Sequence, residues 1–235
     1  MTNISPGGAF TAQESAELGK GAPRHLLKDQ AYARLKARIL QGDFGPGTFL
    51  SERQVSAWLQ MSKTPIRAAL EKLAGEGLIQ ISPQQGVIVR ELSIHEVADH
   101  FEIRSALEPF VVRQVAGRLT AEQTQRLRAN LHEQELSVRQ RDAARNMMLD
   151  TAFHLLLCEF LGNREILRVM EQLRDKIHRV ILRVFSHNPD RLAVGYEEHC
   201  RIAEAVIAGN AEPAARFIQE HLDRGKSILL SPRQR

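Results

Sequence analysis

Hydrophobic side chains recur every three or four positions over most of this sequence, which is the spacing of helices that bury one face. The first such segment runs from residue 26 to 41 and ends at the turn-forming residues 42–47. Short β-branched runs at 78–81 and 87–89 have a strand-like pattern, and from residue 94 onward the periodicity is helical. The pattern therefore predicts a mainly α fold with one small hairpin.

A short helix is predicted to begin after Ser51, because Ser51 and Gln54 have the spacing of a capping box. Its apolar face is formed by Val55, Trp58 and Leu59. Arg53 lies off this face, so we expect its side chain to point into solvent.

A second helix is predicted to begin at Lys63, just after the pattern of the first helix breaks. Ser62 is expected to cap it, and Pro65 is tolerated because the amides of a first helical turn have no intrahelical acceptor. Its inward positions are Ile66, Leu70 and Leu73. Lys63, Thr64 and Arg67 then share the opposite face at the helix N-terminus, where a recognition helix meets the base edges of DNA.

The hairpin completes the pattern of a winged helix. Gly77 is a natural end for the second helix, and the runs 78–81 and 87–89 flank a turn at 82–86. Start, stop and turn signals agree in their order, which makes a generic helical hairpin the weaker interpretation. We therefore expect a winged helix-turn-helix that binds double-stranded DNA.

The same region contains Leu50-Ser51-Glu52-Arg53, Ser62-Lys63-Thr64-Pro65-Ile66-Arg67-Ala68-Ala69-Leu70, Leu73-Ala74-x-x-Gly77-Leu78-Ile79 and Gly86. Together these segments resemble the DNA-binding domain of the GntR family of bacterial transcription regulators. The resemblance implies DNA contacts from Arg53, Lys63, Thr64 and Arg67, with help from Ser62 and with Gly86 letting the wing tip approach the minor groove. It also implies a homodimer on a palindromic operator, because one recognition helix contacts too few base pairs for tight specific binding.

Composition and charge narrow the class of protein. The chain has 235 residues with 43% hydrophobic side chains, enough for two domains with cores of their own. Its formal net charge is only +4, so basic character must act locally, and residues 27–92 contain nine Lys or Arg against six Asp or Glu. Cys158 and Cys200 are isolated, and neither an export signal nor a long apolar run is present. We therefore expect a soluble cytoplasmic protein with no membrane segment.

Helix-start and helix-end signals divide the region after the wing into six predicted helices. Ser93 and Glu96 form a second capping-box pattern, and most later breaks fall at Gly, Asn and Pro residues. The predicted helices span 94–117, 121–139, 142–161, 164–186, 190–208 and 212–229. A helical region of this kind after a GntR-type winged helix resembles the FCD effector domain of the FadR subfamily, in its six-helix, VanR-like variant. The expected organisation is a flexible tail over 1–23, a winged helix over 24–92 and an effector-binding and dimerisation domain over 93–235.

Four potential metal ligands fall on inward faces of these helices. Asp150 and His154 are four residues apart on one apolar stripe, and His199 and His221 lie on apolar stripes of two other helices. A single inward histidine is more often a core residue with one hydrogen bond. An ionised Asp beside three imidazoles in an apolar bundle is costly unless a cation joins them, and a divalent metal ion does so directly.

The family resemblance implies the same site. Asp150-x-x-Phe153-His154, Glu198-His199-x-x-Ile202 and His221-Leu222 match the pattern by which metal-binding FCD domains hold a divalent ion with one Asp and three His. Three nitrogens and one oxygen suit Zn²⁺, Ni²⁺, Mn²⁺ or Fe²⁺, and the sequence does not choose among them. An ion that accepts six ligands would keep two positions for water or for a carboxylate.

Arg104 is the candidate residue for binding an acidic effector. It shares a stripe with Val97 and Val111, so an inward guanidinium there needs an anionic partner. That partner is either Glu108, one turn on, or the acid group of a ligand, and the spacing leaves both open. The resemblance of Glu102-x-Arg104-x-x-Leu107-Glu108 to FCD domains favours a role in the effector pocket.

The expected function is that of a DNA-binding transcription regulator, which the family resemblance implies is a repressor. A small organic acid that binds together with the metal ion is expected to control its DNA binding. A metal sensor, in which the ion itself is the signal, uses the same residues. A metal-dependent hydrolase or oxygenase built on the Asp/His₃ centre is the alternative from another class. No strong general base accompanies the centre and an enzyme has no use for a winged helix, so the regulator is favoured.

Overall fold

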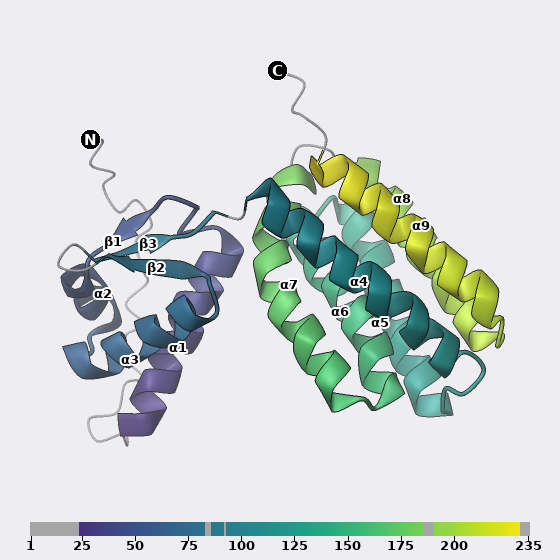
Figure 1. Ribbon diagram of the computed structural model, residues 1–235, viewed down its shortest axis with the longest axis horizontal. Helices are drawn as coiled ribbons and strands as arrows, with labels where there is room; N and C mark the ends of the chain where they lie inside the picture. Colours follow the sequence, from purple (N-terminus) through teal and green to yellow (C-terminus); the bar gives the residue numbers. More distant parts are fainter. Residues whose placement is uncertain (1–23, 83–85, 92, 186–189, 231–235) are drawn as a thin grey trace.

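The computed structural model of the protein describes residues 24–82, 86–91, 93–185 and 190–230. These residues form a winged helix followed by a helical domain (Figure 1). The mainly α class predicted from the sequence is confirmed. The predicted tail over 1–23, the wing tip at 83–85 and the break at 187–189 lie outside the described residues.

The winged helix places three helices against one face of a small sheet. Its elements are α1 (Arg24–Gln41), β1 (Phe49–Leu50), α2 (Glu52–Leu59), α3 (Lys63–Gly75), β2 (Ile79–Ser82) and β3 (Gly86–Val89). β3 lies in the centre of the sheet and pairs antiparallel with both β1 and β2. Buried aliphatic side chains from the helices and the sheet share one core, including Leu35, Leu59, Ile66, Leu73 and Val87. This core fixes α3 with its first turn at the surface.

The starts of these elements test the local predictions. The capping box of Ser51 and Gln54 is present at the start of α2, as predicted. Ser62 occupies the N-cap position of α3, but its side chain makes no capping hydrogen bond, so that part of the prediction is wrong. β1 was not predicted, because two residues are too few to display alternation and only their pairing with β3 makes them a strand.

The helical domain consists of α4 (Ile94–Val115), α5 (Ala121–Gln140), α6 (Ala143–Leu161), α7 (Arg164–Phe185), α8 (Asp190–Ile207) and α9 (Ala211–Leu230). These bounds lie within two residues of the predicted ones. Capping boxes at Ser93 and Thr120 start α4 and α5, and Asp142 caps α6. α4 contains a buried proline, Pro109, in its interior.

Helix α4 runs along α9 (Figure 1), α6 packs against α5 and α7, and α8 packs against α9 and α5. The core contains Val111, Leu127, Phe153, Leu157, Ile202 and Ile218. α4 follows the wing almost directly: Arg90, just after β3, pairs with Glu96 in the first turn of α4 at 2.9 Å. None of the described helices has the length and apolar character needed to cross a membrane.

Candidate metal centre and nucleic-acid interface

The four predicted metal ligands meet inside the helical domain. Asp150 and His154 lie on successive turns of α6, His199 on α8 and His221 on α9. Each offers one ligand atom, and these atoms all lie within 4.8 Å of one another. That separation is close to the spacing of ligands that share one ion about 2.0–2.2 Å away. The three imidazoles are buried, and Asp150 is partly exposed.

Each imidazole is held from outside the cluster through its Nδ1 atom. Nδ1 of His154 lies 2.7 Å from Oε2 of Glu108, and Nδ1 of His221 lies 2.7 Å from Oε2 of Glu198. Nδ1 of His199 lies 2.9 Å from Oε1 of Gln134. An oxygen acceptor at Nδ1 leaves the Nε2 lone pair for a metal ion, which is how ligating histidines are usually oriented.

Two imidazole nitrogens of the cluster lack hydrogen-bond partners among the described residues. Nε2 of His154 and Nε2 of His199 are both buried, and neither has a hydrogen-bond partner in the described ranges. Nε2 of His199 lies 3.6 Å from Oδ1 of Asp150, just beyond hydrogen-bonding distance. Buried polar atoms are rarely left unpaired in native proteins. The residues therefore fit a divalent cation, which would give each of these lone pairs a partner.

Burial and neighbouring charges favour the neutral, metal-binding form of two of the nitrogen ligands, His199 and His221. Burial lowers the pKa of His199 well below its usual value, and the nearby His221 and His154 lower it further. Burial also lowers the pKa of His221, although its hydrogen bond to Glu198 opposes the effect. A neutral imidazole offers a lone pair, whereas an imidazolium does not.

The two supporting carboxylates remain ionised although they are buried. Burial alone would raise the pKa of Glu108, but Arg104 and His154 outweigh it and hold the pKa at about 2. Burial likewise opposes ionisation of Glu198, whose pKa is brought to about 2 by its hydrogen bonds to His221 and Arg191. Both groups can therefore accept the Nδ1 protons of their histidines.

Arg104 makes the internal pair that the sequence left open. Its Nε atom donates to Oε1 of Glu108 at 2.6 Å, and both side chains are buried. Glu108 thus bridges Arg104 to His154. Arg104 also lines two small cavities beside the metal ligands, so the pairing does not remove it from the space in which a ligand would bind.

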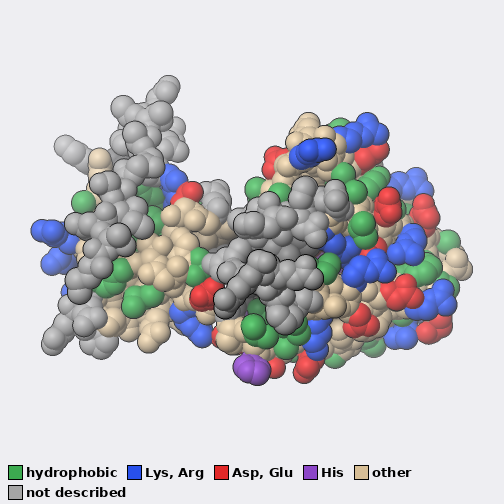
Figure 2. All heavy atoms as spheres, turned by 90° about the horizontal axis from the view of Figure 1, so that it is seen from above, with side chains coloured by type: hydrophobic (Ala, Val, Ile, Leu, Met, Phe, Trp, Pro, Cys, Tyr) green, Lys and Arg blue, Asp and Glu red, His purple; other side chains and the backbone are tan. Residues whose placement is uncertain are grey.

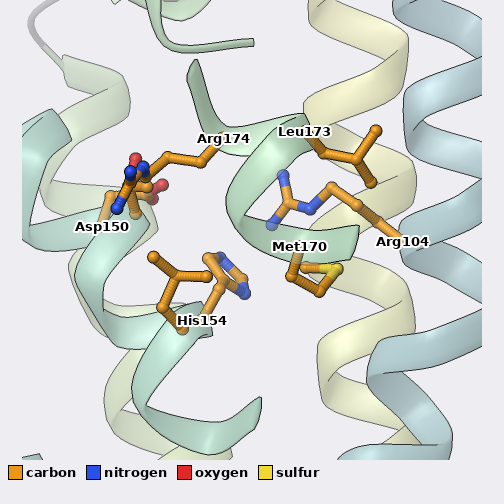
Figure 3. Close-up of a pocket in the computed structure, with 8 residues that line it drawn as sticks. Arg104, Asp150, His154, Met170, Leu173 and Arg174 are labelled. Atoms are coloured by element: carbon orange, nitrogen blue, oxygen red, sulfur yellow. The ribbon is translucent and has the colours of Figure 1, made fainter. Parts of the chain in front are cut away.

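Both cavities include residues of the cluster in their lining, and they share Arg104 and Asp150. The first, shown in Figure 3, is lined by Arg104, Asp150, Thr151, His154, Leu155, Met170, Leu173 and Arg174. Arg104 and Arg174 extend into this region from α4 and α7 (Figure 3). The second is lined by Phe101, Arg104, Asn146, Asp150, Arg191, Leu192, Gly195, His221, Gly225 and Leu229. Two arginines line each cavity, Arg104 with Arg174 in the first and Arg104 with Arg191 in the second, and guanidinium groups suit the binding of an anion.

The predicted DNA-contacting residues lie on the surface of the winged helix. Lys63, Thr64 and Arg67 are exposed on the first turns of α3, and Arg53 is exposed on α2. Ser62 is exposed just before α3. Figure 2 shows acidic and basic side chains interspersed over the visible face of the helical domain.

Gly86 has a local structural role that the sequence did not reveal. Its φ angle is 132°, and a Cβ atom built on it would lie 2.6 Å from the carbonyl oxygen of Leu50 and 2.9 Å from the ring of Phe49. The sheet edge formed by β1 therefore requires glycine here, independently of any contact with DNA.

Several polar residues of the centre were not predicted from the sequence. Gln134 was not identified at all, and Glu198 appeared only as part of a motif. The sequence spacing indicates Glu108 only as a partner of Arg104. Their hydrogen bonds to the histidines join different helices, so helical spacing alone contains no signal for them.

The comparisons with known proteins agree with both halves of this structure. Residues 27–89 match the model for bacterial regulatory proteins of the gntR family, and residues 99–224 match the FCD domain. The chain is 32% identical over 213 residues to the HTH-type transcriptional repressor RspR of Escherichia coli K12, covering 90% of this chain and 92% of RspR. It is 29% identical over 181 residues to the Nta operon transcriptional regulator of Aminobacter aminovorans, covering 77% of this chain and 84% of that protein.

A solved structure shows the same fold. The putative transcriptional regulator GntR from Rhodococcus sp. RHA1 superposes with a TM-score of 0.78 at 22% identity, covering 88% of this chain and 99% of that one. At this identity the similarity concerns the architecture alone.

Proposed function

Because the chain belongs to the gntR family and is a DNA-binding transcription regulator with an FCD domain, we propose that a divalent metal ion and a small organic acid bound in its helical domain control its binding to an operator. The observation that carries the proposal is the arrangement of the three imidazoles. Their Nδ1 atoms are all engaged by outer oxygens, and two buried Nε2 atoms have no partner within the part of the chain that the structure describes. The functional domains are proposed to span 24–92 and 93–235.

The ion would be held by Asp150, His154, His199 and His221. Its charge would offset the cost of burying a carboxylate beside the imidazoles, and it would join α6, α8 and α9 at one point. Zn²⁺, Ni²⁺, Mn²⁺ and Fe²⁺ all accept this donor set. When bound, the ion would act as a Lewis acid that can attract an anionic oxygen.

The acid would bind in the cavities beside the cluster. Arg104 lines both of them, and Arg174 lines the first. A guanidinium recognises a carboxylate through paired N–H donors, which gives direction as well as charge. Because Arg104 is also bonded to Glu108, an acid that attracts Arg104 competes with that carboxylate and alters the support of His154.

The winged helix would contact the operator through Arg53, Ser62, Lys63, Thr64 and Arg67, with Gly86 at the wing. Arginine and lysine at the start of a recognition helix suit base edges and phosphates. A homodimer on a palindromic operator doubles these contacts, and the helical domain is the proposed dimerising part. Repression that the acid relieves is the proposed sign of regulation, as RspR is a repressor by its name.

The metal-sensor alternative uses the same four ligands and differs in which species changes DNA binding. The enzyme alternative finds no support among the relatives, which are transcription regulators. An ion that is needed for folding alone would be a third outcome of the same experiment.

The test begins with an operator selected from random DNA duplexes by rounds of binding to the purified protein. Metal content is measured by elemental analysis, and operator affinity is then measured while metal and a panel of hydroxy and dicarboxylic acids are titrated separately. The proposal expects about one ion per chain and an acid that weakens operator binding only in the metal-loaded protein. A response to metal alone supports the sensor, and a protein that binds no divalent ion contradicts both.

A further inference from the structure

α5 carries a row of buried polar side chains toward the metal centre. Asn130, Gln134 and Ser137 are all buried, and Gln134 is only 1% exposed. Uncharged polar side chains are mostly found at the surface, and when buried they are hydrogen-bonded. The row lies against α6, where Asn146 donates to Oγ of Ser137 at 2.9 Å.

The hydrogen bonds in this row have a fixed direction. Nδ2 of Asn130 donates to the backbone carbonyl of Leu149 at 3.1 Å, and a carbonyl can only accept. Oδ1 of Asn130 is therefore the atom left to accept from Nε2 of Gln134, at 2.7 Å. With its amide nitrogen used in this way, Gln134 presents Oε1 to Nδ1 of His199, at 2.9 Å.

We propose that Gln134 is a positioning residue that holds His199 as the Nδ1–H tautomer and so keeps its Nε2 lone pair free for the ion. This inference rests on the proposed metal site and names the device that prepares one of its ligands. Because Oε1 can only accept, Nδ1 of His199 must carry the proton. The direction set at the Leu149 carbonyl thus determines which nitrogen of His199 carries the proton.

The alternative tautomer would remove Nε2 of His199 as a ligand and would also engage the neighbouring carboxylate of Asp150. Oδ1 of Asp150 lies 3.6 Å from Nε2 of His199. If Nε2 carried the proton, a small shift would let it donate to this oxygen, and neither atom would then offer a free lone pair along that line. Gln134 prevents this internal hydrogen bond by giving the proton a better acceptor on the other side of the ring.

The amide of Gln134 suits this position better than another carboxylate would. Glu108 and Glu198 already place two ionised acceptors around the cluster, in addition to Asp150. Gln134 controls the tautomer of His199 without adding another buried negative charge, which would be costly to desolvate.

Three substitutions in the full-length protein test the inference. Gln134→Met has a similar length and lacks the acceptor. Gln134→Glu keeps an acceptor for Nδ1–H and is the rescue variant. Ser137→Ala is the matched control, because it breaks the same buried row without touching His199. Circular dichroism and thermal unfolding are recorded first, to confirm that each variant is folded.

The first measurement is the tautomer of His199 in metal-stripped protein, read from two-bond ¹H–¹⁵N correlations of labelled histidine and assigned with His199→Gln. We expect Nδ1–H in the wild type, in Ser137→Ala and in Gln134→Glu, and a shift toward Nε2–H in Gln134→Met. The second measurement is affinity for Zn²⁺ against a chromogenic chelator. Gln134→Met should lose about 10- to 100-fold, and the other two variants much less.

An Nε2–H tautomer in the wild type would overturn the inference, as would a Gln134→Met protein that keeps both the tautomer and the affinity. An equal loss of affinity in Ser137→Ala would also overturn it, because the effect would then be one of packing. A wild type that binds no divalent ion would contradict the proposed function, while the tautomer measurement would still decide what Gln134 does.

Discussion

The guanidinium of Arg67 on α3 is held by the carboxylate of Glu52 on α2, with Nε donating to both carboxylate oxygens at 3.0 and 3.1 Å. The pair is exposed at the predicted DNA-binding surface, so water screens it and its contribution to stability is small. Its consequence is geometric: the side chain is oriented before DNA arrives.

Arg67→Ala should weaken operator binding by about 1–3 kcal/mol if Arg67 contacts a base, and it should relax the sequence preference at that position. Competition binding with operator variants measures both effects. Arg216→Ala, an exposed arginine on α9, is the control and should leave affinity unchanged. Full operator affinity in an Arg53→Ala, Arg67→Ala double variant would mean that DNA binds to another face.

Glu52→Gln should have two opposite effects on DNA binding. Removing a negative charge from the DNA-binding surface strengthens binding to any duplex, because phosphate repulsion falls. Loss of the charged partner also frees Arg67, so the ratio of operator to non-specific affinity should decrease. Affinities for the operator and for a scrambled duplex give this ratio, and an unchanged ratio would exclude an orienting role for Glu52.

Lys63→Ala should weaken binding to all duplexes alike if Lys63 contacts a phosphate. Each phosphate contact releases counterions, so the slope of log affinity against log salt should decrease by about 1. A salt titration on operator and scrambled DNA measures this slope. A loss confined to the operator would instead place Lys63 on a base.

His199→Ala should lower metal content and blunt the response to an effector acid, because it removes one of the four clustered ligands. Operator binding by the metal-free protein should persist, since His199 lies in the helical domain. His132→Ala is the matched control, with a histidine side chain that is 66% exposed. Full metal occupancy after Asp150, His154, His199 and His221 are all replaced by alanine would refute the site.

Gly86→Ala should destabilise the wing, because its backbone has a φ of 132° and the new Cβ would lie 2.6 Å from the Leu50 carbonyl oxygen. We expect a loss of about 1–3 kcal/mol in the free energy of unfolding, the usual cost of such strain. Gly47→Ala separates backbone strain from the steric clash. Gly47 also has a positive φ, of 79°, but a Cβ built on it would have nothing within 4 Å. Urea unfolding of both variants should show the larger loss at Gly86.

The parts of this structure that were predictable from the sequence are those governed by local spacing. Helical periodicity gave the helices, and the capping boxes at Ser51 and Ser93 gave two of their starts. The four clustered ligands were predicted from their places on apolar helical stripes together with the match of their motifs to FCD domains. Ser62 shows the limit, since the residue at an N-cap position does not guarantee the capping bond.

The parts that were not predictable depend on contacts between distant segments. β1 is a strand only because β3 pairs with it. Gln134 reaches His199 across 65 positions of sequence, and Glu108 reaches His154 across 46. The sequence does not show whether a polar residue on a helix contacts water or a histidine of another helix. Only the packing of the helices distinguishes these two environments.

Pro109 gives α4 a mechanical property of its own. Proline has no amide hydrogen, so the helix lacks the bond from residue 109 to the carbonyl of Ser105 and bends most easily beside Glu108. The segment from Ile94 to Glu108 is about 21 Å long at 1.5 Å per residue, so a swing of about 5° there would carry Ile94 through about 2 Å. A small bend of α4 beside the metal centre would therefore become a larger displacement of the end of the helix that adjoins the wing.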